Sequence, residues 1–359
     1  MKKNSKLVKG CAVVMAAVMA LSAGILSRTY AAIAVETDKD CSLTVEVDPS
    51  DTLYDDLKDL SIPISLYKVA DITKEGNYVA LTDFDGLGLD KVSSDTTAGE
   101  WETMGLGAFD IVKVGTTLPD FVFTMKDAKG STLDDGNTVK PGMYLVVAGA
   151  YDDSDKDHLY GTVMNPEAIY EFKPYLISLP TNNYASVTSK GSPVGKDDWI
   201  YDVKTGLKPS KTDRLGHLRI IKQLDTFNKT MNDPDGATFV FSVVAVKNGK
   251  TVYDDVVAIQ MKKAGIDFTE ILNLPAGAVV TVTEVYSGSC YTLVSSATDS
   301  ATIVADAFVE VDFENDWNET TGGGYGVVNH FKYSQDKEGR DVWEWEKLEG
   351  GNNDEVLPQ

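Results

Sequence analysis

Apolar and polar residues alternate along most of this chain, and a period of two is typical of β-strands with one buried face. In the first half the alternating runs are SLTVEV, IPISLYKVADI, GNYVALTDF, FVFTM, GMYLVVAGAY, IYEFKPYLISLP and WIYDV. Residues 99–115 (GEWETMGLGAFDIVKVG) are instead the best candidate for a helix. Residues 41–208 are therefore predicted to be mostly strands, with a helical or irregular insertion between two sets of them.

Short alternating runs continue in the second half of the chain: HLRIIKQL, ATFVFSVVAV, TVYDDVVAI, VVTVTEVY, CYTLVSSA, ATIVADA and FVEVDFEN. Turn-forming sequences separate these runs, among them Asn248-Gly249 and the segment LPAG at 274–277. Short strands at this spacing predict a β-sandwich.

A run of glycines at 322–324 predicts a hinge after the last of these strands. Beyond it, GVVNHFKY and DVWEWEKL predict one more β-hairpin, with Trp343 and Trp345 on a shared face. Because two strands alone are marginally stable, we expect this hairpin to dock on the second domain.

The first 34 residues have the organisation of a signal peptide. A basic start (MKKNSKLVKG) precedes an apolar run, and Ala32-Ile33-Ala34 supplies a small-residue cleavage site, with Ala31 as a second option. The apolar run is short for a membrane span and ends in small residues, which favours cleavage over the alternative of an uncleaved anchor. The mature chain is therefore expected to begin after Ala34, to be secreted and to contain no stable membrane span.

The rest of the chain is expected to form two domains and a tail, since 359 residues suffice for two separate cores. Residues 35–210 are predicted to be the first β-sandwich domain, and residues 215–320 the second. The polar stretch KPSKTDRL at 208–215 has the composition of a linker. Residues 321–359 contain the hinge, the hairpin and the tail. The predicted fold class is all-β, with two tandem Ig-like sandwich domains plus a C-terminal β-hairpin.

Charge and motif content exclude several classes of function. The formal charge of −22 becomes −27 when residues 1–34 are removed, and nucleic acid is an unsuitable partner for so acidic a chain. The histidines are scattered without zinc-ligand spacing, and the acidic stretch 153–157 lacks the residues that complete a calcium loop. Phosphate-binding loops and nucleophile elbows are also missing from the sequence. We therefore predict neither a metal nor a cofactor, and no conventional enzyme activity.

Three predicted strands of the second domain each carry one polar group at an inward position: Lys222 in LRIIKQLD, Glu284 in VVTVTEVY and Asn315 in VEVDFENDW. An amine, a carboxyl and a carboxamide are the parts needed to join a lysine to an asparagine by an amide bond. Burial favours the neutral amine that can attack. A glutamic acid kept protonated by the same dry surroundings can polarise the carbonyl and protonate the departing ammonia. A shifted end strand would put Asn318 or Asn329 in place of Asn315, and exposed strand faces would make all three ordinary solvated residues.

The order of these strands resembles the isopeptide-forming domains of Gram-positive pilins and surface adhesins, the Cna B-type and pilin-linkage group. The segment NLPAGAVVTVTE (273–284) is similar to the family's "LPxG…VTE" segment, and FEN (313–315) to its terminal "FxN" strand. The resemblance covers residues 215–320. It implies a Cna B-type fold with Lys222 and Asn315 as the cross-linked pair and Glu284 as the catalytic proton shuttle.

The first domain resembles the N-terminal domain of sortase-assembled pilins, through SLYKVAD, KPGMYLVVAGAY, FKPYLISLP and DDWIYDVKTGLKP. In those pilins a lysine six residues after the Asp of a W-x-YDV-type strand joins one subunit to the next. Counting six from Asp202 gives Lys208, which the resemblance makes the possible linkage lysine, although the local sequence is GLK where such subunits have YPK. SLTVEV lacks a lysine, so we predict no isopeptide bond in this domain.

These resemblances imply a cell-wall surface protein: a pilus subunit or adhesin stalk whose partners are other pilin subunits and a sortase. The alternative is an adhesin whose first domain binds a host matrix protein or a glycan. The final residues, Val356-Leu357-Pro358-Gln359, are similar to the start of an LPxTG sortase signal, and either a fragment or a chance match explains them. An exported chain in which Cys41 and Cys290 fall in different predicted domains needs stabilisation other than a disulfide framework, which an isopeptide bond supplies.

Overall fold

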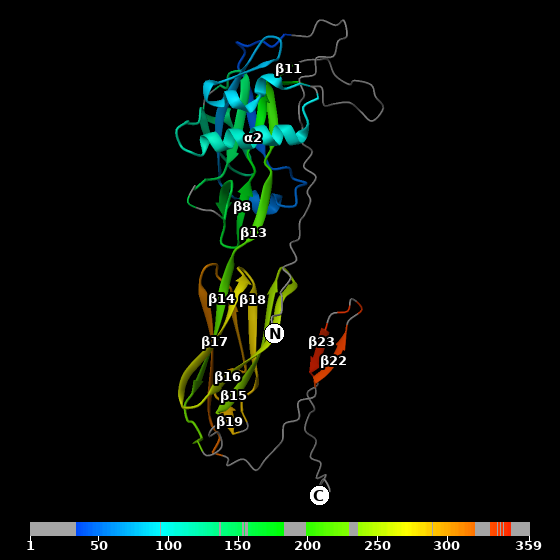
Figure 1. Cartoon of the computed structure of the whole chain (residues 1–359). Helices are drawn as coiled ribbons and strands as arrows, with labels where there is room; N and C mark the ends of the chain where they lie inside the picture. Colours follow the sequence, from blue (N-terminus) through cyan, green and yellow to red (C-terminus); the bar gives the residue numbers. More distant parts are fainter. Residues whose placement is uncertain are drawn as a thin grey trace. The chain divides into compact units, whose positions relative to one another are not determined.

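A computed structural model describes residues 34–345, apart from 183–198, 230–235, 320–330 and the positions 94, 136–137, 153, 155–156, 289, 336, 338 and 340. The chain divides into two compact units, residues 1–215 and 216–359. Figure 1 shows that strands dominate both units, so the prediction of an all-β chain is confirmed.

Unit 1 contains thirteen strands, two α-helices and three 3₁₀ helices among its described residues: β1 Ser42–Glu46, α1 Tyr54–Leu57, β2 Ile62–Ile72, β3 Tyr78–Ala80, η1 Thr82–Leu87, η2 Leu89–Lys91, α2 Ala98–Val112, β4 Phe121–Met125, β5 Lys129–Ser131, η3 Thr132–Asp135, β6 Gly142–Ala148, β7 Gly161–Met164, β8 Ala168–Phe172, β9 Tyr175–Leu179, β10 Thr181–Asn182, β11 Trp199–Ile200, β12 Asp202–Gly206 and β13 Pro209–Asp213. Its largest sheet has the order β3-β2-β6-β9, and β4 also pairs with β2. A second sheet, β12-β1-β5, contains a parallel pair of β1 with β12. The third sheet is β13-β8-β7.

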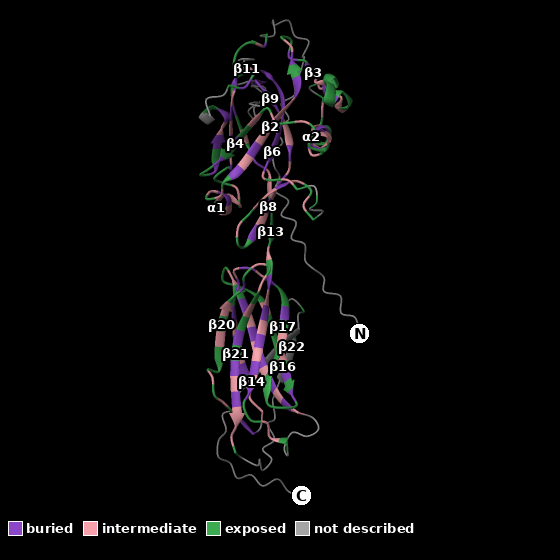
Figure 2. Cartoon of the chain, turned by 90° about the vertical axis from the view of Figure 1, so that its left-hand side faces the viewer, coloured by how far each residue is buried: buried purple, intermediate pink, exposed green. Residues whose placement is uncertain are grey.

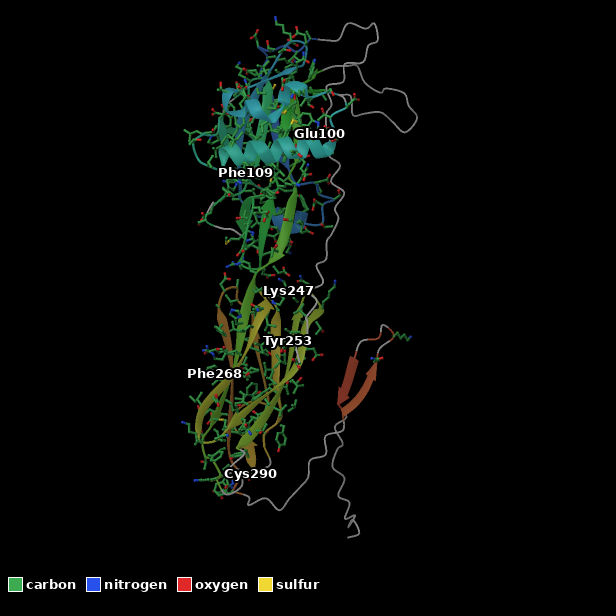
Figure 3. The ribbon with its side chains drawn as sticks, viewed as in Figure 1. Glu100, Phe109, Lys247, Tyr253, Phe268 and Cys290 are labelled. Atoms are coloured by element: carbon green, nitrogen blue, oxygen red, sulfur yellow. The ribbon has the colours of Figure 1, made fainter. Side chains whose placement is uncertain are left out.

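Strand β6 is buried along its whole length, because both faces of the largest sheet are covered. On one face Tyr144 and Val146 belong to a core that includes residues of β1 and β8. On the other face Met143 and Leu145 pack with the apolar side of α2, whose Phe109 is labelled in Figure 3. This explains why GMYLVVA is a continuous apolar run rather than an alternating one.

The predicted helix at 99–115 is confirmed as α2, Ala98–Val112. It begins with a capping box. The Thr97 hydroxyl accepts a hydrogen bond from the Glu100 backbone amide, and the Glu100 carboxylate accepts one from the Thr97 backbone amide. One strand prediction in this region is wrong in part. Of GNYVALTDF, only 78–80 is strand, and the chain then turns into the 3₁₀ helix η1 at 82–87.

The prediction of a linker at 208–215 is also wrong. Residues Pro209–Asp213 form β13, which pairs antiparallel with Ala168–Phe172 of β8. The side chains of this edge strand are almost all exposed, so its sequence has no apolar alternation. Backbone hydrogen bonds to β8, rather than burial of side chains, make it a strand.

The described residues of unit 2 form a sandwich of eight strands, followed by a hairpin: β14 Leu215–Leu224, β15 Ala237–Lys247, β16 Lys250–Met261, β17 Gly265–Pro275, β18 Val279–Tyr286, β19 Tyr291–Leu293, β20 Thr298–Thr302, β21 Phe308–Trp317, β22 Phe331–Gln335 and β23 Asp341–Trp345. One sheet has the order β17-β14-β21-β19, and the other β16-β15-β18-β20. The first and last strands, β14 and β21, are adjacent and parallel. Figure 2 shows buried residues alternating with more exposed ones along both strands.

The turns of unit 2 follow the predicted chemistry. Asn248 and Gly249 have φ of 52° and 73°, and they join β15 to β16 as a two-residue hairpin. The predicted C-terminal hairpin is confirmed as β22 paired antiparallel with β23. Its register puts Trp343 opposite Tyr333 and Trp345 opposite Phe331. Among the described residues, no helix is long and apolar enough to cross a membrane.

Candidate functional site

Three polar residues lie inside the apolar core of unit 2, each on a different strand. Alternation along β14 points Lys222 inward with Leu218 and Ile220, and on β21 it points Asn315 inward with Phe313. Strand β18 does the same for Glu284, which follows two buried valines at the same spacing. The local sequence therefore places each polar group at a position that a strand in this sandwich must bury.

The topology brings these three strands together. Strand β14 pairs with β21 in a parallel register that sets Lys222 opposite Phe313 and Leu224 opposite Asn315. Strand β18 belongs to the other sheet, where Glu284 pairs with Phe241 of β15. The carboxyl group therefore reaches the lysine and the asparagine from across the sandwich.

The three side chains form a closed triangle of hydrogen bonds. The Lys222 Nζ donates to Asn315 Oδ1 at 2.5 Å and to Glu284 Oε2 at 2.8 Å. The Asn315 Nδ2 donates to Glu284 Oε1 at 2.6 Å and to the Ser287 carbonyl at 3.4 Å. Lys222 and Asn315 are 0% exposed, and so is the side chain of Glu284. This degree of burial rules out the alternative that the three are solvated residues on exposed strand faces.

Burial lowers the pKa of the Lys222 amine below its ordinary value of 10.5, because a desolvated ammonium is disfavoured. The hydrogen bond and charge of Glu284, and the charge of Glu314, act in the opposite direction without cancelling the shift. The rings of Phe239 and Phe241 have their centroids 4.7 and 6.0 Å from Nζ. These rings close the site to water and also offer their negative faces to the ammonium form.

The arrangement places a nucleophile, an electrophile and a proton carrier in mutual contact. Since Nζ lies 2.5 Å from Asn315 Oδ1 and a C=O bond is about 1.2 Å long, Nζ is at most about 3.7 Å from the amide carbon. That separation is close to the 3–3.5 Å of a near-attack geometry. Glu284 contacts both the attacking and the departing nitrogen, one with each carboxylate oxygen.

Of the two alternative asparagines, Asn318 lies among the described residues, and it follows the end of the strand that carries Asn315. The backbone amide of Asn318 donates to the Cys290 carbonyl at 3.0 Å, beyond the end of β21. Asn329 lies outside the described residues. Sequence reasoning missed Phe239 and Phe241, although the alternation in ATFVFSVVAV points both of them inward.

The candidate linkage residue Lys208 lies in unit 1, just before β13. Its backbone carbonyl accepts a hydrogen bond from the Lys173 amide at 3.3 Å, and its Nζ lies 5.5 Å from the centroid of the Tyr175 ring. Partial burial lowers the pKa of the Lys208 amine, and the charge of Lys173 lowers it further, while Glu102 opposes both. Lys208 is thus half-buried, and its amine has a lowered pKa. It belongs to unit 1, whereas Lys222, Glu284 and Asn315 belong to unit 2.

The remaining predicted features fall at the edge of the described residues or outside them. Ala34 is exposed, and the next residue, Val35, is 1% exposed and donates its amide to the Lys74 carbonyl at 2.9 Å. The rest of the predicted signal peptide and the final residues 346–359 are outside the described part. Within it, no group of three or more His, Cys, Asp or Glu residues has the geometry to hold a metal.

Comparison with known proteins gives one family match. Residues 218–318 match a family described as "Domain of unknown function (DUF5979)". The match runs from β14 to the end of β21 and so includes all three residues of the triangle. No curated protein matches the chain.

Solved structures similar to this chain include pilins and adhesins. GBS52, the minor pilin of Streptococcus agalactiae, is 15% identical, with 80% of this chain and 100% of that chain covered and a TM-score of 0.23. A Mobiluncus mulieris adhesin containing disulfide, isopeptide and ester cross-links is 14% identical, with coverage of 72% and 84% and a TM-score of 0.25. A streptococcal ancillary pilin is 13% identical, with coverage of 78% and 69% and a TM-score of 0.24.

By their descriptions, these three solved structures are two pilins and one adhesin. Their superpositions on the whole chain are loose. The function of this chain is therefore inferred from its own site.

Proposed function

We propose that this chain is a structural protein of the bacterial cell surface, a pilus subunit or adhesin stalk. Its second domain is strengthened by an isopeptide bond between Lys222 and Asn315. The observation that supports this most strongly is the buried triangle, in which the amine, the carboxamide and the carboxyl contact one another within 2.8 Å.

The reaction begins with a proton transfer from the Lys222 ammonium to the Glu284 carboxylate along their 2.8 Å hydrogen bond. The low polarity of the site favours the neutral pair that results. The free electron pair of Nζ then attacks Cγ of Asn315, while Glu284 Oε1 stays in contact with Nδ2, the nitrogen that will leave.

Collapse of the tetrahedral intermediate needs two further proton movements, and Glu284 contacts both nitrogens involved. Its proton passes to Nδ2, the bond from Cγ to Nδ2 breaks, and ammonia leaves. The carboxylate then removes the extra proton from Nζ. One C–N bond forms and one breaks, no redox partner is needed, and Glu284 ends protonated. The site acts once on its own chain, so the protein is not an enzyme with an external substrate.

The consequence is mechanical. Lys222 and Asn315 are 93 positions apart, on the first and last strands of the sandwich. A bond between them encloses most of the domain in a covalent loop, and β14 and β21 are then joined by a bond as well as by their parallel hydrogen bonds. A pull along the chain would pass through that bond rather than through the strands it encloses.

Mass spectrometry of the intact mature protein tests the bond directly. Loss of one ammonia should lower the mass by about 17 Da relative to the sequence. Glu284→Gln keeps the shape of the side chain but cannot carry the proton, so it should restore the full mass. Glu310→Gln, an exposed change on β21, is the matched control and should retain the deficit. A wild-type protein of full mass, with separate Lys222 and Asn315 peptides in quantitative yield, would overturn the proposal.

Assembly with other subunits is the second part of the proposed function. In this part a sortase joins the Lys208 amine to the C-terminus of another subunit, after export directed by a signal peptide that ends at Ala34. The support from this chain is the half-buried Lys208 amine beside Tyr175, with its pKa lowered by burial and by Lys173. A less basic amine is more often neutral and so more often nucleophilic.

A further inference from the structure

The sandwich of unit 2 has open edges, because neither of its sheets closes on itself. Strands β17 and β19 are the edges of one sheet, and β16 and β20 are the edges of the other. An edge strand presents backbone groups to which a strand of another molecule can add. The first half of β17 carries the most exposed large apolar side chain of these edges, Ile266 at 70%, together with Phe268 at 52%. Figure 3 shows Phe268 at the side of the sandwich.

The same local hydrogen bond occurs on three of these four edge strands. An aspartate side chain accepts a hydrogen bond from the backbone amide of the next residue in the strand. On β16 the Val256 amide donates to Asp255 Oδ1 at 2.8 Å, on β17 the Phe268 amide to Asp267 Oδ1 at 2.9 Å, and on β20 the Ser300 amide to Asp299 Oδ1 at 2.8 Å.

The geometry of this contact places each amide on the open side of its strand. Amides in a strand point alternately to its two sides, and one that faces a paired neighbour has that neighbour's carbonyl before it, with no space for a carboxylate. The same contact occurs between Trp317 and Asp316 at 2.8 Å, where β21 has passed the end of its pairing with β14. Aspartate is depleted in strands, so its recurrence at these positions is not explained by strand propensity.

We propose that Asp255 and Asp267 are caps that keep the edges of this sandwich from pairing with a second copy of the chain. Asp299 is not included, because its Oδ2 also accepts a hydrogen bond from the Asp312 amide of β21 at 3.4 Å, so the outer side of β20 lies against β21. Each carboxylate accepts a hydrogen bond from a backbone amide that could otherwise donate to a strand of another molecule. Each also adds negative charge to the edge, which repels an identical edge. The edge that pairs when its cap is lost is β17.

Strand β17 is complementary to itself about the capped residue. In an antiparallel pair with two-fold symmetry centred on Phe268, each Phe268 amide would bond to the other Phe268 carbonyl, and these amides are the groups that the cap withholds. That register sets Ile266 opposite Glu270, and Asp267 opposite Thr269, so like charges do not meet. The two exposed Phe268 rings would face each other across the join, an aromatic pair that stabilises a sheet.

The test measures the association of the mature chain, residues 35–359, by light scattering on size-exclusion chromatography over a range of concentrations. Asp267→Ala removes both the cap and the charge, and it should give a discrete dimer that forms at least ten times more tightly than any wild-type dimer. Asp267→Asn keeps an acceptor oxygen at the same place, and should stay monomeric. Asp254→Ala removes the same charge from β16, at an exposed residue that neighbours a cap without being one, and should also stay monomeric.

Two further measurements separate edge pairing from unfolding and aggregation. Lysine at an exposed edge is a common block to strand addition, so Asp267→Ala combined with Phe268→Lys should return the protein to a monomer with an unchanged melting temperature. Hydrogen exchange of the Phe268 amide in Asp267→Ala should be about tenfold faster than in the wild type at low concentration, and slower than in the wild type once the dimer forms. A variant that stays monomeric at all concentrations, or a dimer that Phe268→Lys does not dissociate, would overturn the inference.

Discussion

Lys222 and Asn315 lie on adjacent parallel strands but are not directly opposite each other, since Lys222 is in register with Phe313. The asparagine is two residues further along β21, or roughly 6.6 Å at about 3.3 Å per residue. A lysine side chain is long enough to cover this diagonal, and Nζ reaches Oδ1 at 2.5 Å while both side chains stay in the core. The offset therefore suits the length of lysine.

Removing the lysine nitrogen should destabilise unit 2 strongly and leave unit 1 unchanged. Lys222→Met preserves most of the volume but provides no amine. Closing a loop of about 90 residues is worth roughly 4–5 kcal/mol in the chain-entropy treatment of cross-links, a large part of the whole stability of many domains. We therefore expect the melting transition of unit 2 to fall by roughly 20 °C or more.

Limited proteolysis with mass spectrometry checks which unit is affected. Cleavage of Lys222→Met should begin within residues 216–317, while residues 35–215 remain intact, since the two units have separate cores. Cleavage that starts in unit 1, or a melting profile equal to that of the wild type, would contradict the role of the bond.

The uncross-linked site should give unit 2 an unusual dependence on pH. In Glu284→Ala the bond does not form, and Lys222 is left buried without its carboxylate. Its pKa is lowered by burial in the folded state and has the ordinary value of 10.5 in the unfolded state. Between these two values the unfolded state binds more protons, so the free energy of unfolding rises with pH. Below the lowered pKa the full cost of a buried, unpaired ammonium applies.

Thermal melting of Glu284→Ala from pH 7 to pH 10 measures this effect. The melting temperature of unit 2 should rise across that range relative to Lys222→Met/Glu284→Ala, which contains no titrating amine at this place. The double variant subtracts the tyrosines and surface groups that titrate in the same window. Parallel curves for the two variants would mean that Lys222 is not held in the core as an amine.

Much of the fold and of the site could be predicted from the sequence, because a period of two identifies both strands and their inward residues. The pattern put Lys222, Glu284 and Asn315 inside the sandwich before any pairing was known. It did not give the hydrogen bonds of the triangle, since these depend on which strands become neighbours. β14 and β21 are adjacent although about 90 residues separate them in the sequence.

The features that the sequence pattern missed lie on edge strands of the sheets. Strand β13 was missed because its side chains are almost all exposed, and pairing with β8 rather than burial defines it. The aspartate contacts on β16, β17 and β20 were missed for a related reason. A sequence shows that Asp267 precedes Phe268, but only the pairing order shows that β17 is an edge with an amide to protect.

Linkage between subunits should depend on Lys208. Co-expression of the chain, fused to an intact sorting signal, with its cognate pilin sortase should give a ladder of covalent multimers, which Lys208→Ala abolishes. Lys204→Ala removes an exposed lysine from β12 nearby and is the matched control, in which the ladder should persist. A ladder that survives Lys208→Ala would place the linkage at another amine.

The last prediction is mechanical and follows from where the proposed bond would lie in the chain. When unit 2 is pulled from its two ends, force enters at β14 and leaves at β21, which are adjacent and parallel, and the proposed Lys222–Asn315 bond would connect them directly. The residues between them should carry no load, so single-molecule pulling of the wild type should show no extension from residues 223–314. Glu284→Gln, which keeps the fold and lacks the bond, should release about 90 residues in one event, roughly 300 Å at about 3.3 Å per residue. Unit 1 has no lysine on β1, so it should unfold in both proteins and provides an internal reference within each trace. Equal extension of unit 2 in the two proteins would show that the covalent loop is not closed, whatever the melting temperatures.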